Sequence, residues 1–170
     1  MGGRVARKLR TWFGQPGFVR VWAVPVWGAL GIARLAVLVL RFQRLGDFMG
    51  VDQGVEPWVP LASPSQRERA LLIARTIAMA ARNTPWVSNC FPQALVARLM
   101  LRFYGIPHAV YLGLARTPDG TGLTAHAWVA CDRIAVSGGA GFHAFTVVGM
   151  FVPRSLAADR PVTGRGTDAA

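Results

Sequence analysis

The sequence contains few of the residues that build disulfide frameworks or metal sites. It has two cysteines and three histidines in 170 residues. Cys90 and Cys131 have no CxxC spacing, and no paired-histidine pattern lies near them, so a zinc site is not indicated. Two cysteines do not make a disulfide framework either. We therefore expect reduced thiols, a cytoplasmic protein, and no metal or cofactor bound by this chain.

Acidic residues are also scarce, at 8 against 19 basic ones, which gives a net charge of +11. Within the first fifty residues Asp47 is the only acid, and the basic residues there are Arg4, Arg7, Lys8, Arg10, Arg20, Arg34, Arg41 and Arg44. This balance indicates an anionic partner, such as a membrane surface, a nucleic acid or an acidic peptide. The tryptophans between these arginines have surroundings too apolar for base stacking, so we do not expect nucleic acid as a partner.

A long uninterrupted hydrophobic run is missing as well. Within the apolar segment Phe18 to Arg44, the longest uncharged run is Val21 to Ala33, about 13 residues, against roughly 20 needed to span a bilayer. Pro25 and Arg34 interrupt the segment further. No small-residue cleavage site follows it, so a signal peptide is not expected. Two interpretations remain for residues 1 to 45. One is a helical arm with a basic stripe that docks on the inner face of a membrane or on partner enzymes and takes no part in the chemistry. The other is a helical pair folded onto the main domain.

The chain divides into three predicted parts. Residues 1–62 form the basic, apolar helical arm and a connector rich in glycine and proline, residues 63–153 form the main domain, and residues 154–170 form a disordered tail. Two overlapping capping boxes, Ser63 with Gln66 or Ser65 with Glu68, predict a helix that runs to about Arg82. Alternating patterns then predict strands over 106–115, 123–130, 134–137 and 145–152. The fold class is therefore α+β.

Between the first helix and the strands, residues 89–105 predict a second helix with a cysteine in its first turn. Ser88 or Asn89 can act as N-cap, Pro92 lies where a missing N–H costs little, and Gly105 can close the helix. The unpaired N–H groups and the dipole at a helix start favour the thiolate form of Cys90, which is the nucleophilic form. The alternative is that Cys90 is a buried structural cysteine.

His126 lies inside the apolar run Ala125-His126-Ala127-Trp128-Val129. A histidine in such a strand is either a hydrogen-bonded core residue or a working base. Combined with a thiol at an upstream helix start, it matches the papain or transglutaminase arrangement of cysteine hydrolases. We expect Cys131 to be a structural thiol at a strand end. His108 and His143 are expected on the surface or in loops.

These residues resemble a known family. The matching features are Trp86 with three residues between it and Cys90, then Gln93-Ala94-Leu95, Leu99, Gly105, Gly113 and the block around His126. Over about Ser65 to Val152 the chain resembles the leader peptidases of lasso-peptide biosynthesis, which have a transglutaminase-like cysteine protease fold. The resemblance implies removal of the leader from a ribosomally made precursor peptide. It also implies a small leader-recognition protein and an ATP-dependent cyclase as partners, with ATP and Mg²⁺ needed only by that cyclase.

The resemblance also implies roles for two residues. Cys90 would attack the scissile carbonyl, and His126 would act as general base and then as general acid. The backbone N–H of Cys90 is a natural oxyanion donor. No side-chain donor is identifiable.

The family's third catalytic residue has no counterpart here. Family members usually carry an aspartate on the strand after the histidine, but a hairpin centred on Asp132 places Gly138 across from His126. Asp132 itself would lie roughly 20 Å away along the strand, so we reject it. Ser137 would point to the other face unless the glycines hold a bulge. A carbonyl or a water would then orient His126. Two alternatives to the peptidase follow, an acyltransferase on the same fold and a non-catalytic leader-binding or scaffold subunit.

Overall fold

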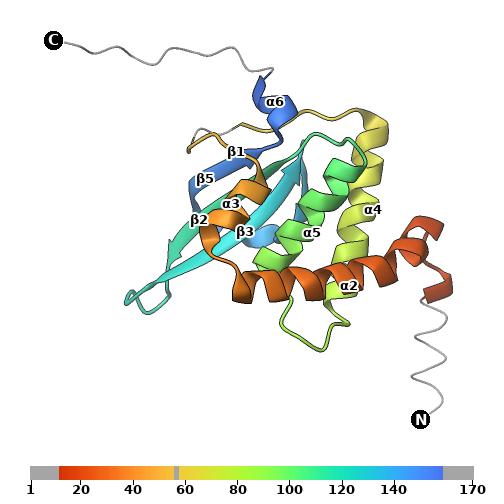
Figure 1. Cartoon of the computed structure of the whole chain (residues 1–170), viewed down its shortest axis with the longest axis horizontal. Coiled ribbons are helices and arrows are strands. Elements are labelled where there is room, and N and C mark those ends of the chain that lie inside the picture. The colour runs from red at the N-terminus through yellow and green to blue at the C-terminus, as the bar shows by residue number, and fades with distance from the viewer. Residues whose placement is uncertain (1–11, 56–57, 159–170) are drawn as a thin grey trace.

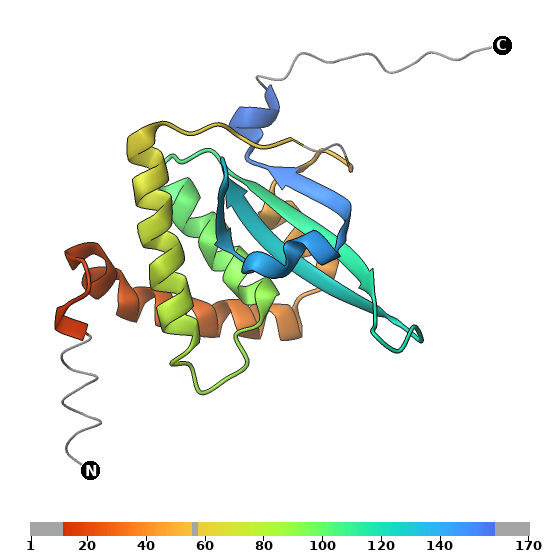
Figure 2. The same ribbon diagram turned by 180° about the vertical axis from the view of Figure 1, so that it is seen from behind.

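The computed structural model describes residues 12–55 and 58–158 and shows an α+β fold. The expectations for residues 1–11, for Glu56 and Pro57, and for the end of the tail from residue 159 on lie outside the described residues. The elements are α2 Gly17–Val39, α3 Phe42–Met49, β1 Val51–Asp52, α4 Pro64–Ala81, α5 Cys90–Phe103, β2 Ala109–Arg116, β3 Leu123–Cys131, β4 Ile134–Ser137, the 3₁₀ helix η1 Ala140–Ala144, β5 Thr146–Val152 and α6 Arg154–Ala158. Helices α4 and α5 pack side by side on the sheet, and α2 crosses them (Figures 1 and 2).

The sheet is antiparallel with strand order β1-β5-β2-β3-β4. All four predicted strands are present, close to their predicted bounds. Sequence analysis missed β1, a two-residue strand that pairs with β5 through Val51 and Val152. Such a short edge strand has no periodicity of its own, because its pairing partner lies far away in sequence.

Helix α4 begins at the first of the two predicted capping boxes. The backbone N–H of Gln66 donates to the Ser63 hydroxyl oxygen at 3.3 Å, and the Ser63 N–H donates to the Gln66 side-chain oxygen at 2.9 Å. Ile73 and Ile77 are buried in the core. The box fixes where α4 starts, and the two isoleucines fix which of its faces meets the sheet and α5.

Helix α2 folds onto the main domain through one face only. Its buried stripe recurs every three or four residues, and Val26, Leu30 and Ala33 belong to the same hydrophobic cluster as α4 and α5. The second interpretation of the arm, a helix packed against the domain, therefore describes this face. The opposite face remains apolar and exposed, and includes Val24 and Leu35.

The interruption expected in the arm does not occur. Pro25 lies inside α2, which continues past it and past Arg34 to Val39. A proline removes one helical hydrogen bond, and packing against α4 and α5 outweighs that loss. Arg41 lies beyond the helix end and does not share a helical face with Arg20 and Arg34. By length and composition alone, this 23-residue helix could cross a membrane.

Packing of α2 also reaches the segment before Cys90. The rings of Trp27 and Trp86 lie 4.7 Å apart, and the Trp27 indole N–H donates to the Asn83 carbonyl at 3.1 Å. Gly31 permits this approach, since a Cβ there would lie 2.9 Å from the Trp86 ring. The arm thus contacts the loop that leads into the Cys90 helix.

A pair of leucines tests whether α2 is part of the core. Leu30 is fully buried, whereas Leu35, on the same helix, is 62% exposed. We expect Leu30→Ala to lower the free energy of unfolding by about 2–5 kcal/mol, and Leu35→Ala to change it by less than about 0.5 kcal/mol. Urea titration of both variants measures the difference. Equal, small losses would show that α2 is not packed into the core.

Candidate functional site

The start of α5 matches the predicted nucleophile helix. Asn89 is the N-cap residue, Cys90 is the first helical residue, and Pro92 is buried in the first turn. The Asn89 side chain makes no capping bond, and the Gln93 side-chain amide instead donates to the Ser88 carbonyl at 2.6 Å. Backbone N–H groups in a first turn have no intrahelical acceptor. The free, half-buried thiol of Cys90 therefore lies beside unpaired donors.

Cys90 and His126 line the same pocket, whose volume is about 460 Å³. Its remaining walls are mostly apolar and carry no charged side chain; they come from Val37, Leu40, Leu45, Asn89, Phe91, Leu112, Gly113, Leu114, Ala125, Ala127 and Val148. Val37, Leu40 and Leu45 belong to the arm segment that we expected to take no part in the chemistry. The structure differs here, because the end of α2 folds back over the start of α5.

His126 is held by a backbone carbonyl. Its Nε2 lies 2.8 Å from the carbonyl oxygen of Gly138. A carbonyl oxygen can only accept, so Nε2 carries the proton and Nδ1 keeps the lone pair that a general base needs. The imidazole also stacks on Phe145, with ring centres 4.8 Å apart, and on Trp128 at 5.9 Å. A carbonyl, one of the two orienting groups expected from the sequence, is thus the observed partner of His126.

The thiol and the imidazole share a pocket but are not hydrogen-bonded to each other among the described residues. The alternation of β3 explains the separation. Ala127 and Val129 face the cluster that contains α5, whereas His126 lies on the face of Trp128. Catalytic hydrogen bonds are often long without substrate and tighten in the complex. The roles of Cys90 and His126 therefore stay predictions.

The observed pairing of β3 with β4 differs from the predicted register around Gly138. The turn spans Asp132 and Arg133, so Cys131 pairs with Ile134, and a bulge follows at Val129 and Ala130. The ladder ends at Ser137, one residue before Gly138. The expected pairing of Gly138 directly across from His126 is therefore wrong. Its carbonyl reaches the ring because φ at Gly138 is +90°, a conformation that favours glycine.

This glycine offers a test of the carbonyl contact. A Cβ at Gly138 would lie 2.3 Å from the Cβ of Trp128, so Gly138→Ala must displace the backbone. We expect a loss of about 1–3 kcal/mol in unfolding free energy, and a fall of about 10- to 100-fold in turnover at temperatures where the variant is folded. Gly141→Ala is the control, because nothing lies within 4 Å of its new methyl group. Nitrogen NMR of the His126 ring should show loss of the fixed Nε2–H tautomer in Gly138→Ala only, and an unchanged tautomer would contradict the contact.

Asp132 has a structural position away from the pocket of Cys90. Its carboxylate pairs with Arg67 at 3.0 Å, and its backbone N–H donates to the Pro60 carbonyl at 2.9 Å. Its φ of +53° closes the β3–β4 turn. Asp132 thus ties the connector and α4 to the end of β3.

The predicted positions of the other two histidines and of Cys131 can be compared with the structure. His143 is exposed on η1, as expected. His108 lies in the loop before β2, as one of the two expectations has it, but it is not on the surface, because its ring is buried and its Nδ1 donates to the Ile106 carbonyl at 2.8 Å. Burial lowers the pKa of His108 to about 4. Cys131 is a buried thiol at the end of β3, and burial raises its pKa to about 11.

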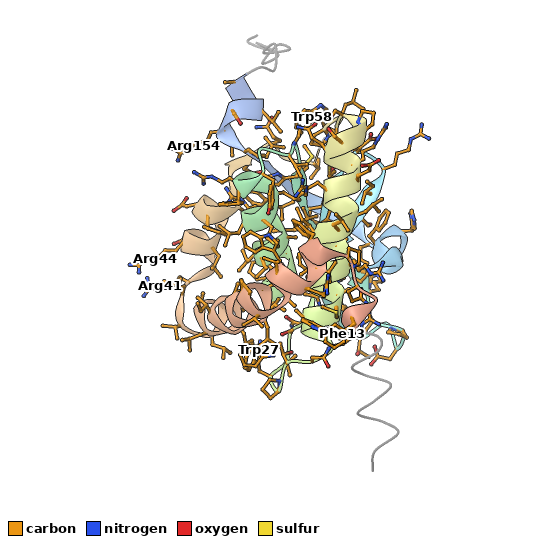
Figure 3. All side chains as sticks on the ribbon, turned by 90° about the vertical axis from the view of Figure 1, so that its right-hand side faces the viewer. Phe13, Trp27, Arg41, Arg44, Trp58 and Arg154 are labelled. Carbon is orange, nitrogen blue, oxygen red and sulfur yellow. The ribbon has the colours of Figure 1, made fainter. Side chains whose placement is uncertain are left out.

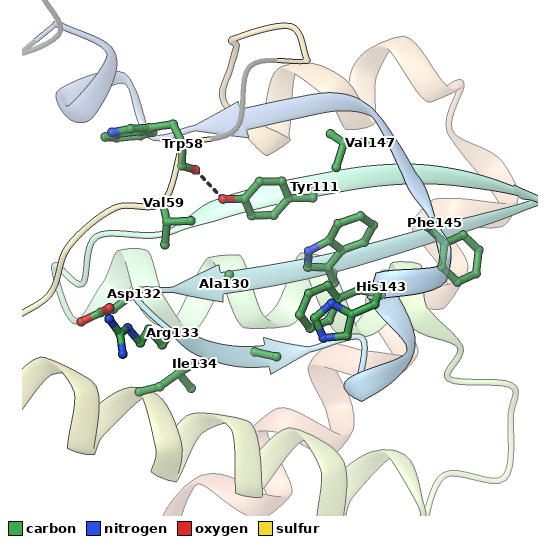
Figure 4. A pocket seen from close by; sticks show the side chains of 13 residues that line it. Trp58, Val59, Tyr111, Ala130, Asp132, Arg133, Ile134, His143, Phe145 and Val147 are labelled. Carbon is green, nitrogen blue, oxygen red and sulfur yellow. Dashed lines mark hydrogen bonds between the residues drawn. The ribbon is translucent and has the colours of Figure 1, made fainter.

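A second pocket, of about 380 Å³, lies on the sheet face that carries Trp128 (Figure 4). Aromatic side chains line it, and the Tyr111 hydroxyl donates to the Trp58 carbonyl. Phe145 lines this pocket and also stacks on His126, so the imidazole lies between the two cavities. The sequence could not show this, because the pocket joins the connector, four strands and η1.

No cluster of three or more histidine, cysteine, aspartate or glutamate side chains suited to a metal ion occurs among residues 12–55 and 58–158.

Asn89 also lines the pocket of Cys90, which the sequence analysis did not predict. Its side chain makes no capping hydrogen bond, so its amide is a candidate oxyanion donor beside the Cys90 N–H.

An antiparallel sheet supported by a helix that begins with cysteine, and a strand histidine in the same pocket, define a thiol-enzyme-like scaffold. The family comparison agrees, since the model of the transglutaminase-like superfamily matches residues 33–150. The chain belongs to the transglutaminase-like superfamily. No curated protein and no solved structure gives a significant match.

Proposed function

We propose that this protein is a cysteine peptidase that removes the leader from a ribosomally made lasso-precursor peptide, with Cys90 as nucleophile and His126 as general base and acid. The observation that carries the proposal is the shared pocket. Cys90 lies at the start of α5, and His126 is held in the Nε2–H tautomer by the Gly138 carbonyl. Membership of the transglutaminase-like superfamily supports thiol chemistry on acyl groups.

In the proposed reaction, His126 Nδ1 takes the proton of the Cys90 thiol and the sulfur attacks the scissile carbonyl. The backbone N–H of Cys90 donates to the resulting oxyanion. Collapse breaks the C–N bond, and the imidazolium protonates the leaving amine of the core peptide. A water molecule, deprotonated by His126, then attacks the thioester and releases the leader with a free carboxylate.

The walls of the pocket support a preference in the substrate. Leu40, Leu45 and Leu112 supply apolar surface, and none of the lining side chains is charged. A charged residue bound here would lose hydration without gaining a partner, which costs several kcal/mol. We therefore propose that uncharged residues flank the scissile bond. The precursor would be presented by a small leader-recognition protein and passed on to an ATP-dependent cyclase.

Two other functions fit the same fold. An acyltransferase would use the same thioester but transfer the acyl group to an amine, and a scaffold subunit would bind the leader without cleaving it. Incubation of a precursor peptide with this protein and its recognition partner in H₂¹⁸O, followed by mass spectrometry, separates the three. Hydrolysis gives a free leader with one ¹⁸O in its new carboxylate. Transfer gives an adduct without ¹⁸O, and scaffolding leaves the precursor intact; either result would overturn the peptidase.

A further inference from the structure

Arg98 is a buried cation with an unused donor. It lies on α5 and is 4% exposed; its Nε donates to the Met49 carbonyl at 2.7 Å, and its guanidinium lies 4.6 Å from the centre of the Phe48 ring. Its Nη1 is buried and has no hydrogen-bond partner among the described residues. Buried charged donors are normally paired, so an unpaired Nη1 indicates that a water, an ion or a ligand binds to it.

Arg98 lines a pocket of about 470 Å³ between α3, α5 and α6, together with Arg102, Arg154, Ser155 and Asp47. The only ion pair among the described residues joins Arg67 to Asp132, so Asp47 neutralises none of these arginines at contact distance. Three guanidinium groups against one carboxylate leave an excess of positive charge. Guanidinium forks match the geometry of phosphate and carboxylate oxygens.

An apolar surface adjoins this arginine pocket. Phe48 lines both the arginine pocket and a second cavity of about 470 Å³, whose walls from α2, α3 and α5 are apolar apart from Arg44. Next to that cavity runs the outer stripe of α2, with side chains 62–72% exposed: Val21, Val24, Ile32, Leu35 and Val39. Soluble monomers rarely expose continuous apolar patches of this kind unless the patch binds something.

Basic side chains surround the apolar stripe. Arg34 lies on α2, and Arg41 and Arg44 are exposed at the start of α3. Figure 3 shows Arg41, Arg44 and Arg154 along the same side of the molecule. The face therefore combines apolar side chains with arginines, and Asp47 is the only acid on α2 and α3. An acidic peptide would match the arginines but not the exposed apolar stripe, whereas an anionic phospholipid matches both.

We propose that the face formed by α2, α3 and α5 docks on a membrane that contains anionic phospholipid, with a headgroup phosphate in the pocket of Arg98, Arg102 and Arg154. The outer stripe of α2 would enter the boundary between headgroups and acyl chains, as interfacial helices do. Helix α2 would lie on the membrane and not cross it, since its other face is buried in the core. Val37 and Leu40 would then place the Cys90 pocket beside the membrane surface.

The test is sedimentation of the full chain with neutral phosphatidylcholine vesicles and with vesicles containing 30 mol% phosphatidylglycerol, each at low and high salt. We expect binding to the anionic vesicles that weakens in salt but persists. Each basic residue near an anionic surface contributes roughly fivefold in affinity. Arg102→Gln with Arg154→Gln should therefore lower the affinity by about 25-fold or more. Both side chains are exposed, and thermal unfolding checks that the double variant is folded.

Two matched variants make the test specific. Arg75→Gln removes an exposed charge on α4, outside both pockets, and should change the affinity less than twofold. Leu35→Glu should abolish the salt-resistant part of binding without affecting stability. Equal losses per charge at Arg75 and at the pocket would overturn the headgroup site in favour of general charge attraction. A higher unfolding temperature in inorganic phosphate or polyglutamate, with no binding to either vesicle, would overturn the lipid proposal in favour of a free anion or an acidic peptide.

Discussion

We expect Cys90→Ala to abolish leader cleavage and to leave the fold intact. Removal of a covalent nucleophile typically costs about 10⁴-fold or more in turnover, because the residual rate then depends on binding and oxyanion donors alone. The effect on stability should be small, since Cys90 is only half-buried at the first position of α5 and alanine favours helix. The measurement is single-turnover cleavage of the precursor peptide alongside thermal unfolding.

Cys131 provides the matched control for this prediction. Its thiol is buried and has a raised pKa, so it cannot substitute as nucleophile. Cys131→Ala should retain cleavage, with a stability loss expected of a buried side chain. Iodoacetamide should label Cys90 in the folded protein and leave Cys131 unmodified. Full cleavage by Cys90→Ala would end the cysteine-peptidase proposal.

His126→Ala should be comparably damaging, whereas Asp132→Ala should leave turnover near the wild-type value. Loss of a general base costs about 10²–10⁴-fold. Asp132 lines the aromatic pocket and not the pocket of Cys90, and its carboxylate is bonded to Arg67. Its removal should cost about 1–2 kcal/mol of stability, from a half-exposed ion pair and the left-handed turn conformation.

The two variants must be compared where both are folded, so turnover is measured well below the unfolding midpoint of Asp132→Ala. His126→Gln serves as a further control, because glutamine can still donate to the Gly138 carbonyl but cannot act as a base. It should be stable and inactive. A large loss of turnover in folded Asp132→Ala would mean that the carboxylate acts on His126 in the working enzyme, contrary to the arrangement described.

Local signals in the sequence were sufficient for much of the fold. The Ser63 capping box, the Asn89-Cys90 helix start and the alternating pattern around His126 act within a few residues, so periodicity and capping rules locate them. These same signals identified both proposed catalytic side chains. A carbonyl was one of two alternatives for orienting His126, and Gly138 could not be named as its source, because a backbone atom leaves no mark on the side-chain pattern beyond an unusual glycine.

Contacts between distant segments explain what the sequence could not show. His108 follows a proline near a strand start, which is typical of a loop, yet its surroundings bury it. Helix α2 is apolar on two faces, so the pattern alone could not separate the face packed on α5 from the face left exposed. The pocket walls from Val37, Leu40 and Leu45 depend on how α2 and α3 fold back over α5.

The most direct test of the central claim is the intact mass of the protein after rapid mixing with precursor peptide and quenching in acid. The account predicts a transient adduct with the mass of the leader acyl group, located on Cys90 by fragmentation and absent from Cys90→Ala. The adduct should accumulate when its hydrolysis is slowed. Cleavage of the precursor without any such adduct, or an adduct on Cys131, would contradict the claim that Cys90 is the nucleophile.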